Sequence, residues 1–241
     1  MFYLQRFVLP VLLILSLHAF SVSQVKFSAG PTVGMTLPSG DYSGTTIDYY
    51  NGTKYGLGSG VNFGAVLKAG FSVVTIKASL NFSSLSNSGN SEPGQGSVNV
   101  KQKLFMIGIG PEFGFSLKGS PVKPYAGIDL LFTSFSGETS FQGVSKVPSG
   151  TYSMSSSSRT GIGFGIGAEF SVAKKYALDL NIKYNMLNLM GKDFTGGPDR
   201  INSYLALNDE KDPLYPDDKH PIGSSRSISV IQFNLAFLFG F

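Results

Sequence analysis

The last ten residues of the sequence carry the feature that most constrains its fold. From Gln232 to Phe241 they read Q-F-N-L-A-F-L-F-G-F, and an apolar side chain recurs at every second position. These positions are Phe233, Leu235, Phe237, Phe239 and Phe241. A soluble protein rarely exposes such an apolar stripe. A strand of a lipid-embedded barrel requires one, because one of its faces contacts acyl chains and the other faces the lumen.

Seven further segments alternate in the same way. A period of two over about 9–11 residues is the length of a tilted membrane strand. We therefore predict an all-β fold, an eight-stranded antiparallel transmembrane up-and-down β-barrel. The expected strands are Lys26–Met35, Val61–Lys68, Ser72–Phe82, Val100–Phe115, Pro124–Phe135, Gly161–Ser171, Tyr176–Leu187 and Ser227–Phe241.

Short and long connections alternate between these strands. The short ones are Ala69–Gly70, Lys118–Lys123 and Val172–Lys175, and the long ones are Thr36–Gly60, Ser83–Asn99, Ser136–Thr160 and Asn188–Arg226. Periodicity alone cannot separate this pattern from a soluble lipocalin-like barrel, whose apolar residues point inward. Turns on one side and long loops on the other are typical of outer-membrane barrels, so the connections favour the membrane reading.

The first residues are typical of an export signal. Arg6 precedes an apolar run from Phe7 to Leu17, and Ser21-Val22-Ser23 offers small residues for cleavage before Gln24. We expect a signal peptide at 1–23 and a barrel domain at 24–241, with a membrane anchor as the less favoured alternative. The sequence has no cysteine, which excludes a lipoprotein anchor and disulfide bonds.

The charge balance bears on the class of partner. The formal net charge is only +4, and the basic residues are dispersed along the sequence. A protein that binds nucleic acid usually concentrates basic residues on one face. We therefore expect no nucleic-acid partner.

Charged residues fall on the faces of the predicted strands that would line the lumen. A charge in a narrow lumen must be paired, because an unpaired buried charge is costly. The sequence therefore predicts a structural polar network rather than a set of catalytic carboxylates. Its expected members are Lys26, Lys68, Lys77, Glu112, Asp129, Glu169, Asp179 and Lys183.

Two motifs suggest other chemistry but have simpler explanations. Gly163–Ala168 matches the dinucleotide-binding pattern G-x-G-x-x-A, yet strict alternation continues through it and no helix follows, so we expect space-making glycines in a narrow barrel. His220 is the single histidine outside the expected signal peptide and stands beside Pro221. A solvated loop histidine is the simpler reading, so we expect no enzyme, no catalytic residue and no cofactor.

The last long loop is rich in acidic side chains, and its five acids are Asp209, Glu210, Asp212, Asp217 and Asp218. Oxygen-rich loops can bind Ca²⁺, but this spacing matches no calcium motif, and Pro213 and Pro216 interrupt it. We expect a solvated loop face and no metal site.

Three stretches carry a resemblance to a known family. They are K-P-Y-A-G-I-D at Lys123–Asp129, G-I-G-F-G-I-G-A-E at Gly161–Glu169 and the terminal Phe241. With them the sequence resembles small eight-stranded outer-membrane barrels of the OmpA and OmpX type, most of all the PorT-like "outer membrane protein β-barrel domain" group. The resemblance implies the outer membrane of a Gram-negative bacterium, contact with outer-membrane lipid and lipopolysaccharide, and insertion by the barrel-assembly machinery. We expect that machinery to read Phe237, Phe239 and Phe241 as the assembly signal.

The resemblance leaves several functions open, since one fold serves many functions. We expect a non-enzymatic structural or surface-binding protein with a packed lumen, acting through its long external loops. The alternatives are a PorT-like component of type IX secretion assembly, a small pore, and an enzyme acting on outer-leaflet lipid. A protein partner is expected at the first and last loops, Thr36–Gly60 and Asn188–Arg226. The contact chemistry would come from the acids and from Tyr42, Tyr49, Tyr50 and Tyr55.

Overall fold

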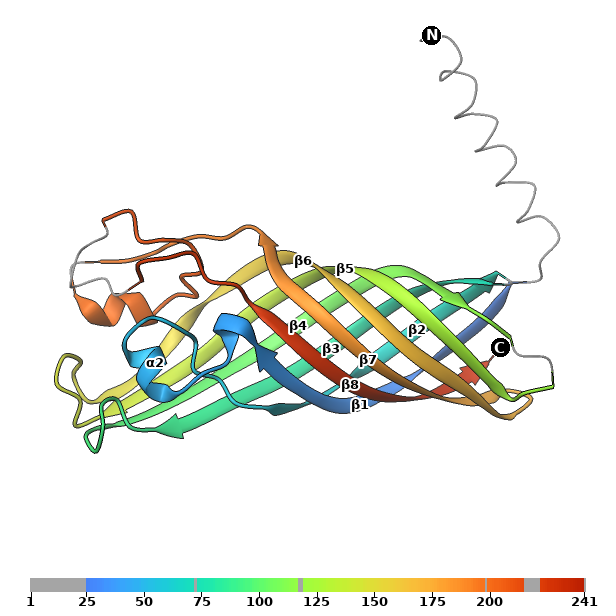
Figure 1. The fold of residues 1–241 in the computed structure, drawn as a ribbon, viewed down its shortest axis with the longest axis horizontal. Coiled ribbons are helices and arrows are strands. Elements are labelled where there is room, and N and C mark those ends of the chain that lie inside the picture. The colour runs from blue at the N-terminus through green and yellow to red at the C-terminus, as the bar shows by residue number, and fades with distance from the viewer. Residues whose placement is uncertain (1–24, 72, 117–118, 198, 215–221, 241) are drawn as a thin grey trace, which may run out of the picture.

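The protein folds into a closed barrel of eight antiparallel strands, each paired with its neighbours in the chain and the last paired with the first (Figure 1). This computed structural model describes residues 25–71, 73–116, 119–197, 199–214 and 222–240. The strands are β1 Lys26–Ser39, β2 Gly60–Phe71, β3 Val74–Gly89, β4 Ser97–Gly114, β5 Val122–Gln142, β6 Gly150–Ala173, β7 Tyr176–Met190 and β8 Ser229–Gly240. The predicted fold class is confirmed.

The two ends of the barrel differ. The end where β8 finishes is called the turn end. The opposite end carries the two longest connections, 40–59 and 191–228, and is called the loop end (Figure 1). At the loop end lie three short helical segments, η1 Gly40–Tyr42, α2 Thr46–Tyr50 and η2 Arg200–Tyr204. No described helix is long and apolar enough to cross a lipid bilayer.

Two of the predicted long loops are wrong. The second and third were expected at Ser83–Asn99 and Ser136–Thr160, but most of these residues are strand. β3 and β4 continue until only residues 90–96 connect them, and residues 143–149 connect β5 and β6. The four central strands therefore project beyond the others at the loop end.

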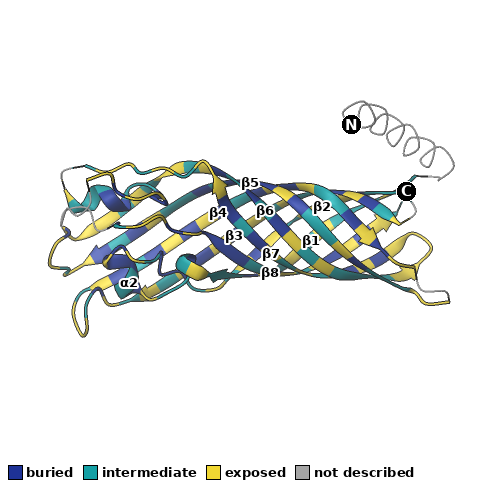
Figure 2. Ribbon diagram, turned by 45° about the horizontal axis from the view of Figure 1, so that its top comes forward, coloured by how far each residue is buried: buried dark blue, intermediate teal, exposed yellow. Residues whose placement is uncertain are grey.

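A band of apolar side chains encircles the outer wall, and we call it the apolar belt. Every strand contributes to it, and its exposed members include Val33, Phe63, Leu80, Ile107, Leu130, Ile166, Leu180 and Leu235. Exposed and buried residues alternate along the strands (Figure 2). A surface this apolar is stable against lipid and unfavourable against water, so the apolar belt marks the part of the barrel that spans the membrane.

The kind of side chain on each face of the strand changes along β4. Within the apolar belt Ile107 and Ile109 point outward, whereas nearer the loop end Lys101 and Lys103 are the exposed residues. The buried positions change in the opposite sense, from Glu112 to Leu104, Val100 and Val98. Water replaces lipid outside the barrel at this point, so apolar side chains gain by turning inward.

The projecting strands and the loops above them form a second folded part, which we call the head. Its interior is a cluster of buried apolar side chains from β3, β4, β5, β7, β8 and the loops, including Leu85, Val98, Phe135, Phe141, Leu187, Leu207 and Ile228. The molecule thus has a polar interior within the membrane and an apolar core beyond it.

Candidate functional site: a filled lumen beneath a folded head

The lumen contains a chain of ion pairs that we call the charge ladder. Lys68 of β2 lies at its centre, with Nζ 2.6 Å from the Asp179 carboxylate of β7 and 2.9 Å from that of Glu112 of β4. These three side chains are almost fully buried. Buried charges of this kind are tolerated only when they are well paired, and here each has an opposite charge in contact.

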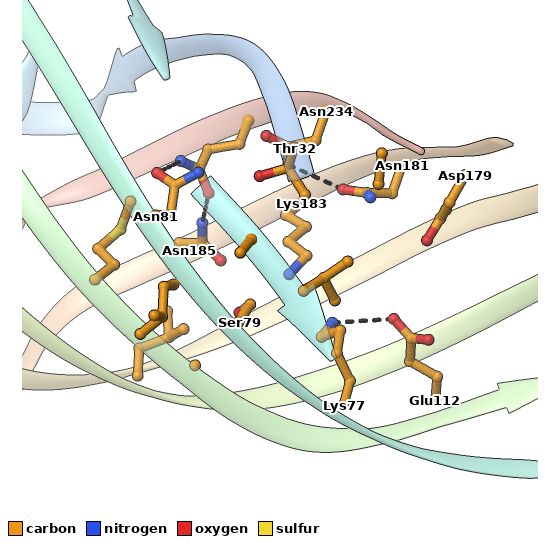
Figure 3. A pocket seen from close by; sticks show the side chains of 18 residues that line it. Thr32, Lys77, Ser79, Asn81, Glu112, Asp179, Asn181, Lys183, Asn185 and Asn234 are labelled. Atoms are coloured by element: carbon orange, nitrogen blue, oxygen red, sulfur yellow. Dashed lines mark hydrogen bonds and ion pairs between the residues drawn. The ribbon is translucent and has the colours of Figure 1, made fainter. Parts of the chain in front are cut away.

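The charge ladder continues on the other side of Glu112. Lys77 of β3 lies 3.1 Å from Glu112 and 3.0 Å from Asp129 of β5, and Lys183 of β7 also lies 3.0 Å from Asp129. Positive and negative groups therefore alternate across the barrel from β7 through β5, β3, β4 and β2. Figure 3 shows Lys77 directed toward Glu112, with Lys183 and Asp179 nearby.

Two residues expected in this network lie at its edge or outside it. Glu169 is 3.8 Å from Lys68 and its side chain is 28% exposed, so it flanks the charge ladder near the turn end. Lys26 is exposed at the start of β1, opposite Gly70, and forms no ion pair with a described residue. Its position has the right parity for the lumen, but the strand begins there and the side chain meets solvent instead of a partner.

The glycines of β6 make room for large lumenal side chains. A Cβ added at Gly163 would lie 2.4 Å from Asn185 Oδ1, and one at Gly167 would lie 2.5 Å from the Tyr125 ring. Tyr125 uses that space to donate a hydrogen bond of 2.6 Å to Asp179, and Lys68 lies 4.5 Å from the centre of its ring. Sequence reasoning missed Tyr125, although its place four residues before Asp129, on the same strand face, gave a signal.

A layer of amides lies between the charge ladder and the head. Asn185 donates to Gln232 at 2.9 Å, and Gln232 donates to Asn81 at 3.0 Å. A cavity of only about 40 Å³ lies between the two layers (Figure 3). That volume holds a few water molecules, and the lumen next to it is filled by side chains.

The tyrosines of the first loop close the barrel at the loop end. Tyr42, Tyr49, Tyr50 and Tyr55 are all buried, with at most 7% of their surface exposed. Tyr42 donates to Gln102 at 2.8 Å and Tyr55 to the Leu207 carbonyl at 2.9 Å. The sequence expectation that these side chains form an exposed contact surface is wrong, because they anchor the loop inside the head.

The first loop folds this way because its local sequence begins the short helix α2 directly after Thr45. Thr45 and Asp48 form a capping box in which the Thr45 hydroxyl accepts from the Asp48 amide and Asp48 accepts from the Thr45 amide at 2.8 Å. The bond from the Thr45 amide lowers the pKa of Asp48. The short helix α2 then directs Tyr49 and Tyr50 into the head.

The last loop is held by a buried acid. Asp209 is fully buried and receives two hydrogen bonds from the Arg159 guanidinium, at 2.9 and 2.7 Å, and one from Asn188 at 2.8 Å. Burial alone would raise the pKa of Asp209, but the bonds from Arg159 and Asn188 hold it below its ordinary value. A bidentate arginine–carboxylate pair is a strong structural contact.

The expectation of a solvated acidic face is therefore wrong for part of this loop. Asp212 is buried as well as Asp209, whereas Glu210 is exposed. Asp217, Asp218 and His220 lie outside the described residues. In the part of the chain that is described, no three acidic, histidine or cysteine side chains are grouped to hold a metal ion.

The residues expected as the assembly signal lie on the outer wall. Phe237 and Phe239 of β8 are exposed in the apolar belt, and their rings pack edge to face at 4.9 Å. Tyr176 of β7 contacts both rings. Phe241 and the expected signal peptide 1–23 lie outside the described residues.

Comparisons with known proteins agree with this architecture. Two solved structures resemble it, each with a TM-score of 0.50. Neisserial surface protein A is 13% identical and aligns over 90% of this chain and 99% of its own. The outer membrane protein OprG from Pseudomonas aeruginosa is 10% identical and aligns over 91% and 97%. Likeness at such identity shows the fold alone, and no curated protein matches the sequence.

A family profile gives the stronger result. The profile described as "Outer membrane protein beta-barrel domain" matches residues 7–204, which is most of the chain. The match agrees with the apolar belt and the closed eight-stranded barrel, and it places the protein in the outer membrane. The chain belongs to the outer membrane protein β-barrel domain family.

Proposed function

We propose that the protein is a non-enzymatic outer-membrane barrel that binds a partner outside the cell through its head. The observation that carries this proposal is the head itself. Four strands continue past the apolar belt and enclose an apolar core, and two long loops fold onto that core. A membrane anchor does not need such a structure, whereas a rigid binding surface does, because preorganisation lowers the entropic cost of binding.

The interior favours binding over transport. The charge ladder fills the lumen within the membrane, and the buried tyrosines close it at the loop end. An eight-stranded barrel has room only for side chains. On these grounds we favour a binding role over a small pore, an enzyme acting on lipid and a PorT-like role.

The binding surface differs from the one expected from the sequence. Because the tyrosines and two of the acids point inward, the first and last loops mainly support the head. The hairpin tips at 90–96 and 143–149 lie at the loop end of the molecule (Figure 1) and expose polar residues, among them Gln95, Lys146 and Ser149. These tips are the surface that we propose for a polar partner.

The proposal is tested by replacing both tips with Gly-Ser segments of equal length in cells that display the protein. The control replaces Lys174 and Lys175 of a short turn at the opposite end with serine. Binding of the cells to arrays of immobilised extracellular proteins and glycans is measured, and heat-modifiable gel mobility checks that each barrel assembles. We expect the tip variant alone to lose binding.

Two results would contradict the proposal. If the intact protein binds nothing on the arrays, the head is not a binding surface for those classes. If the variant with Lys174 and Lys175 replaced loses binding while the tip variant keeps it, an envelope-assembly role on the turn side becomes the better explanation.

A further inference from the structure

The outer wall carries a groove at the border between the apolar belt and the head. It has a volume of about 440 Å³ and crosses β4, β5, β6 and β7. Its apolar lining is Phe105, Ile107, Phe132 and Met190, and its polar lining includes Ser134, Ser158 and Thr160. Arg159 also lines the groove, but it is buried and its guanidinium is paired with Asp193 and Asp209. Phe132 and Met190 are 48% and 67% exposed, so these side chains have no protein partner covering them.

The strand register explains why the wall is hollow here. Phe105 pairs with Ser134, and Ser134 pairs with Ser158, so two small side chains follow a large one around the barrel. On the other side of Phe105, the Phe82 ring stacks on the Phe105 ring with their centres 4.7 Å apart. The Phe63 ring in turn stacks on the Phe82 ring at 5.5 Å. The groove therefore has a continuous aromatic wall on one side and a floor of small residues.

The depth of the groove in the membrane follows from the outward face of β4. From the membrane centre toward the loop end, this face reads Ile109, Ile107, Phe105, Lys103 and Lys101. The groove lies at Phe105, where apolar side chains give way to charged ones. Acyl chains end and lipid headgroups begin at this level.

Lys103 is an exposed lysine at this border without an ion-pair partner among the described residues. Lys101 pairs with Glu138 of β5 at 3.2 Å, whereas no ion pair joins Lys103 to any residue in the described ranges. The neighbours of Lys103 in the register are Ser84 and Ser136, both hydroxyl donors. Among the described strand residues, Lys101 and Lys103 are the outward-pointing cations on the loop side of the apolar belt.

From these observations we infer that the groove and Lys103 form a binding site for one phosphorylated lipid of the outer leaflet. An acyl chain lies in the groove against Phe105 and Phe132, and the phosphate lies against the Lys103 ammonium. The hydroxyls of Ser84 and Ser136 donate to the phosphate oxygens. The apolar groove and the uncompensated charge complement the two parts of such a lipid, and neutral lipid would leave the charge unmatched.

The charge arm of the test compares Lys103→Gln with Lys101→Gln. Each purified protein is titrated in detergent with diphosphoryl lipid A, and native mass spectrometry gives the fraction that carries one lipid. We expect Lys103→Gln to weaken binding about five-fold, the effect of about 1 kcal/mol per lysine near a charged lipid surface. Lys101→Gln should leave affinity within two-fold of the intact protein, since Glu138 already neutralises Lys101. Equal losses in the two variants would overturn the site.

The groove arm uses Ser158→Leu, which fills the hollow, and Thr151→Leu, an exposed position on the same strand within the head. We expect the first to reduce lipid retention and the second to have no effect, with assembly checked by gel mobility. Lipid A without phosphates should bind more weakly to the intact protein, and inorganic phosphate at equal concentration should not displace the lipid. Displacement by phosphate would identify a simple anion site, and indifference to the phosphates would identify a groove for acyl chains alone, so either result contradicts the inference.

Discussion

At the scale of single residues, the burial of an ion pair determines how much the loss of one partner lowers the stability of the protein. Lys68 is 3% exposed and contacts two carboxylates that are equally buried, whereas Lys101 and Glu138 form a pair that is half exposed. Removing one partner of a buried pair leaves a charge in a medium of low polarity. An exposed pair contributes little, because water replaces the lost contact.

We therefore predict that Lys68→Met lowers the free energy of unfolding by about 3–5 kcal/mol. The matched control Lys101→Met should change it by less than about 1 kcal/mol. Urea unfolding of the protein in phospholipid vesicles, followed by circular dichroism, measures both. Equal and small effects would mean that Glu112 and Asp179 find other partners and that the charge ladder is not a stabilising unit.

Asp209 gives the head a dependence on pH. Because Asp209 has a lowered pKa in the folded protein, its contribution to stability is fully present above the ordinary value of about 3.9 and is lost as the pH falls through the lowered value. The head should therefore loosen in acid and be insensitive between pH 5 and 8 through this group.

Hydrogen exchange of the last loop at several pH values tests this prediction. In Asp209→Asn the exchange at pH 7 should already be faster, because the charge partner of Arg159 is lost. The difference between the variant and the intact protein should shrink as the pH falls below 4. A difference that stays constant with pH would show that Asp209 acts by shape and not by charge.

At the scale of the elements, the faces of the strands could be predicted from the sequence, whereas the loop-side ends of β3, β5 and β6 could not. The alternation within the apolar belt fixes the outward face, since the period of two places Phe105, Ile107 and Ile109 on the same side of the strand. Beyond Phe82 in β3 the residues still alternate, but the apolar Leu85 faces inward. A rule that reads apolar as outward ends the strand at this point and assigns a loop.

The candidate site shows the same limit. The period of two places Lys68, Lys77 and Asp129 on the strand face opposite the apolar residues. In a membrane strand that face lines the lumen. Which lysine contacts which carboxylate depends on the register of neighbouring strands, and so does the exposure of Lys26. Tyr42 is buried because it contacts residues far away in the sequence, among them Gln102 of β4, which accepts its hydrogen bond. No local sequence pattern predicts such contacts.

The last strand allows a prediction about assembly. Phe239 of β8 and Phe113 of β4 are exposed to similar extents on the outer wall, 45% and 49%, so replacing either with serine removes similar apolar contact with lipid. If the assembly machinery reads the last strand, Phe239→Ser should lower the yield of heat-modifiable barrel in cells more than Phe113→Ser. Refolding of both purified variants in vesicles supplies the control, since no machinery is present there. Equal yields in cells would remove Phe239 from the assembly signal.

At the scale of the whole molecule, two independent layers close the barrel. The charge ladder fills the membrane part, and the head closes the loop end with a core that includes the buried tyrosines. We expect that removing one layer leaves the other in place, because the charge ladder and the head core share no ion pair among the described residues. The cavity between them, about 40 Å³, has no room for a continuous column of ions.

We predict that the purified protein shows no porin-sized conductance in planar bilayers, even when residues 40–59 are replaced by a Gly-Ser segment of equal length. The expectation rests on the filled lumen of a barrel with eight strands. A porin recorded under the same conditions serves as the positive control for large openings. Large and stable openings of the intact monomer would contradict the closed barrel.

The change of side-chain chemistry along β4 also has a consequence for how the protein reaches its place. The head lies across the bilayer from the end of β8, so its hairpins must traverse the membrane before their apolar core can assemble. During that passage Val98, Val100 and Phe141 cannot be enclosed, and only after arrival do they become buried. Folding of the head then makes withdrawal unfavourable, because the hairpins could return only after their core came apart. The free energy released when the head folds outside the membrane therefore favours the inserted state over withdrawal.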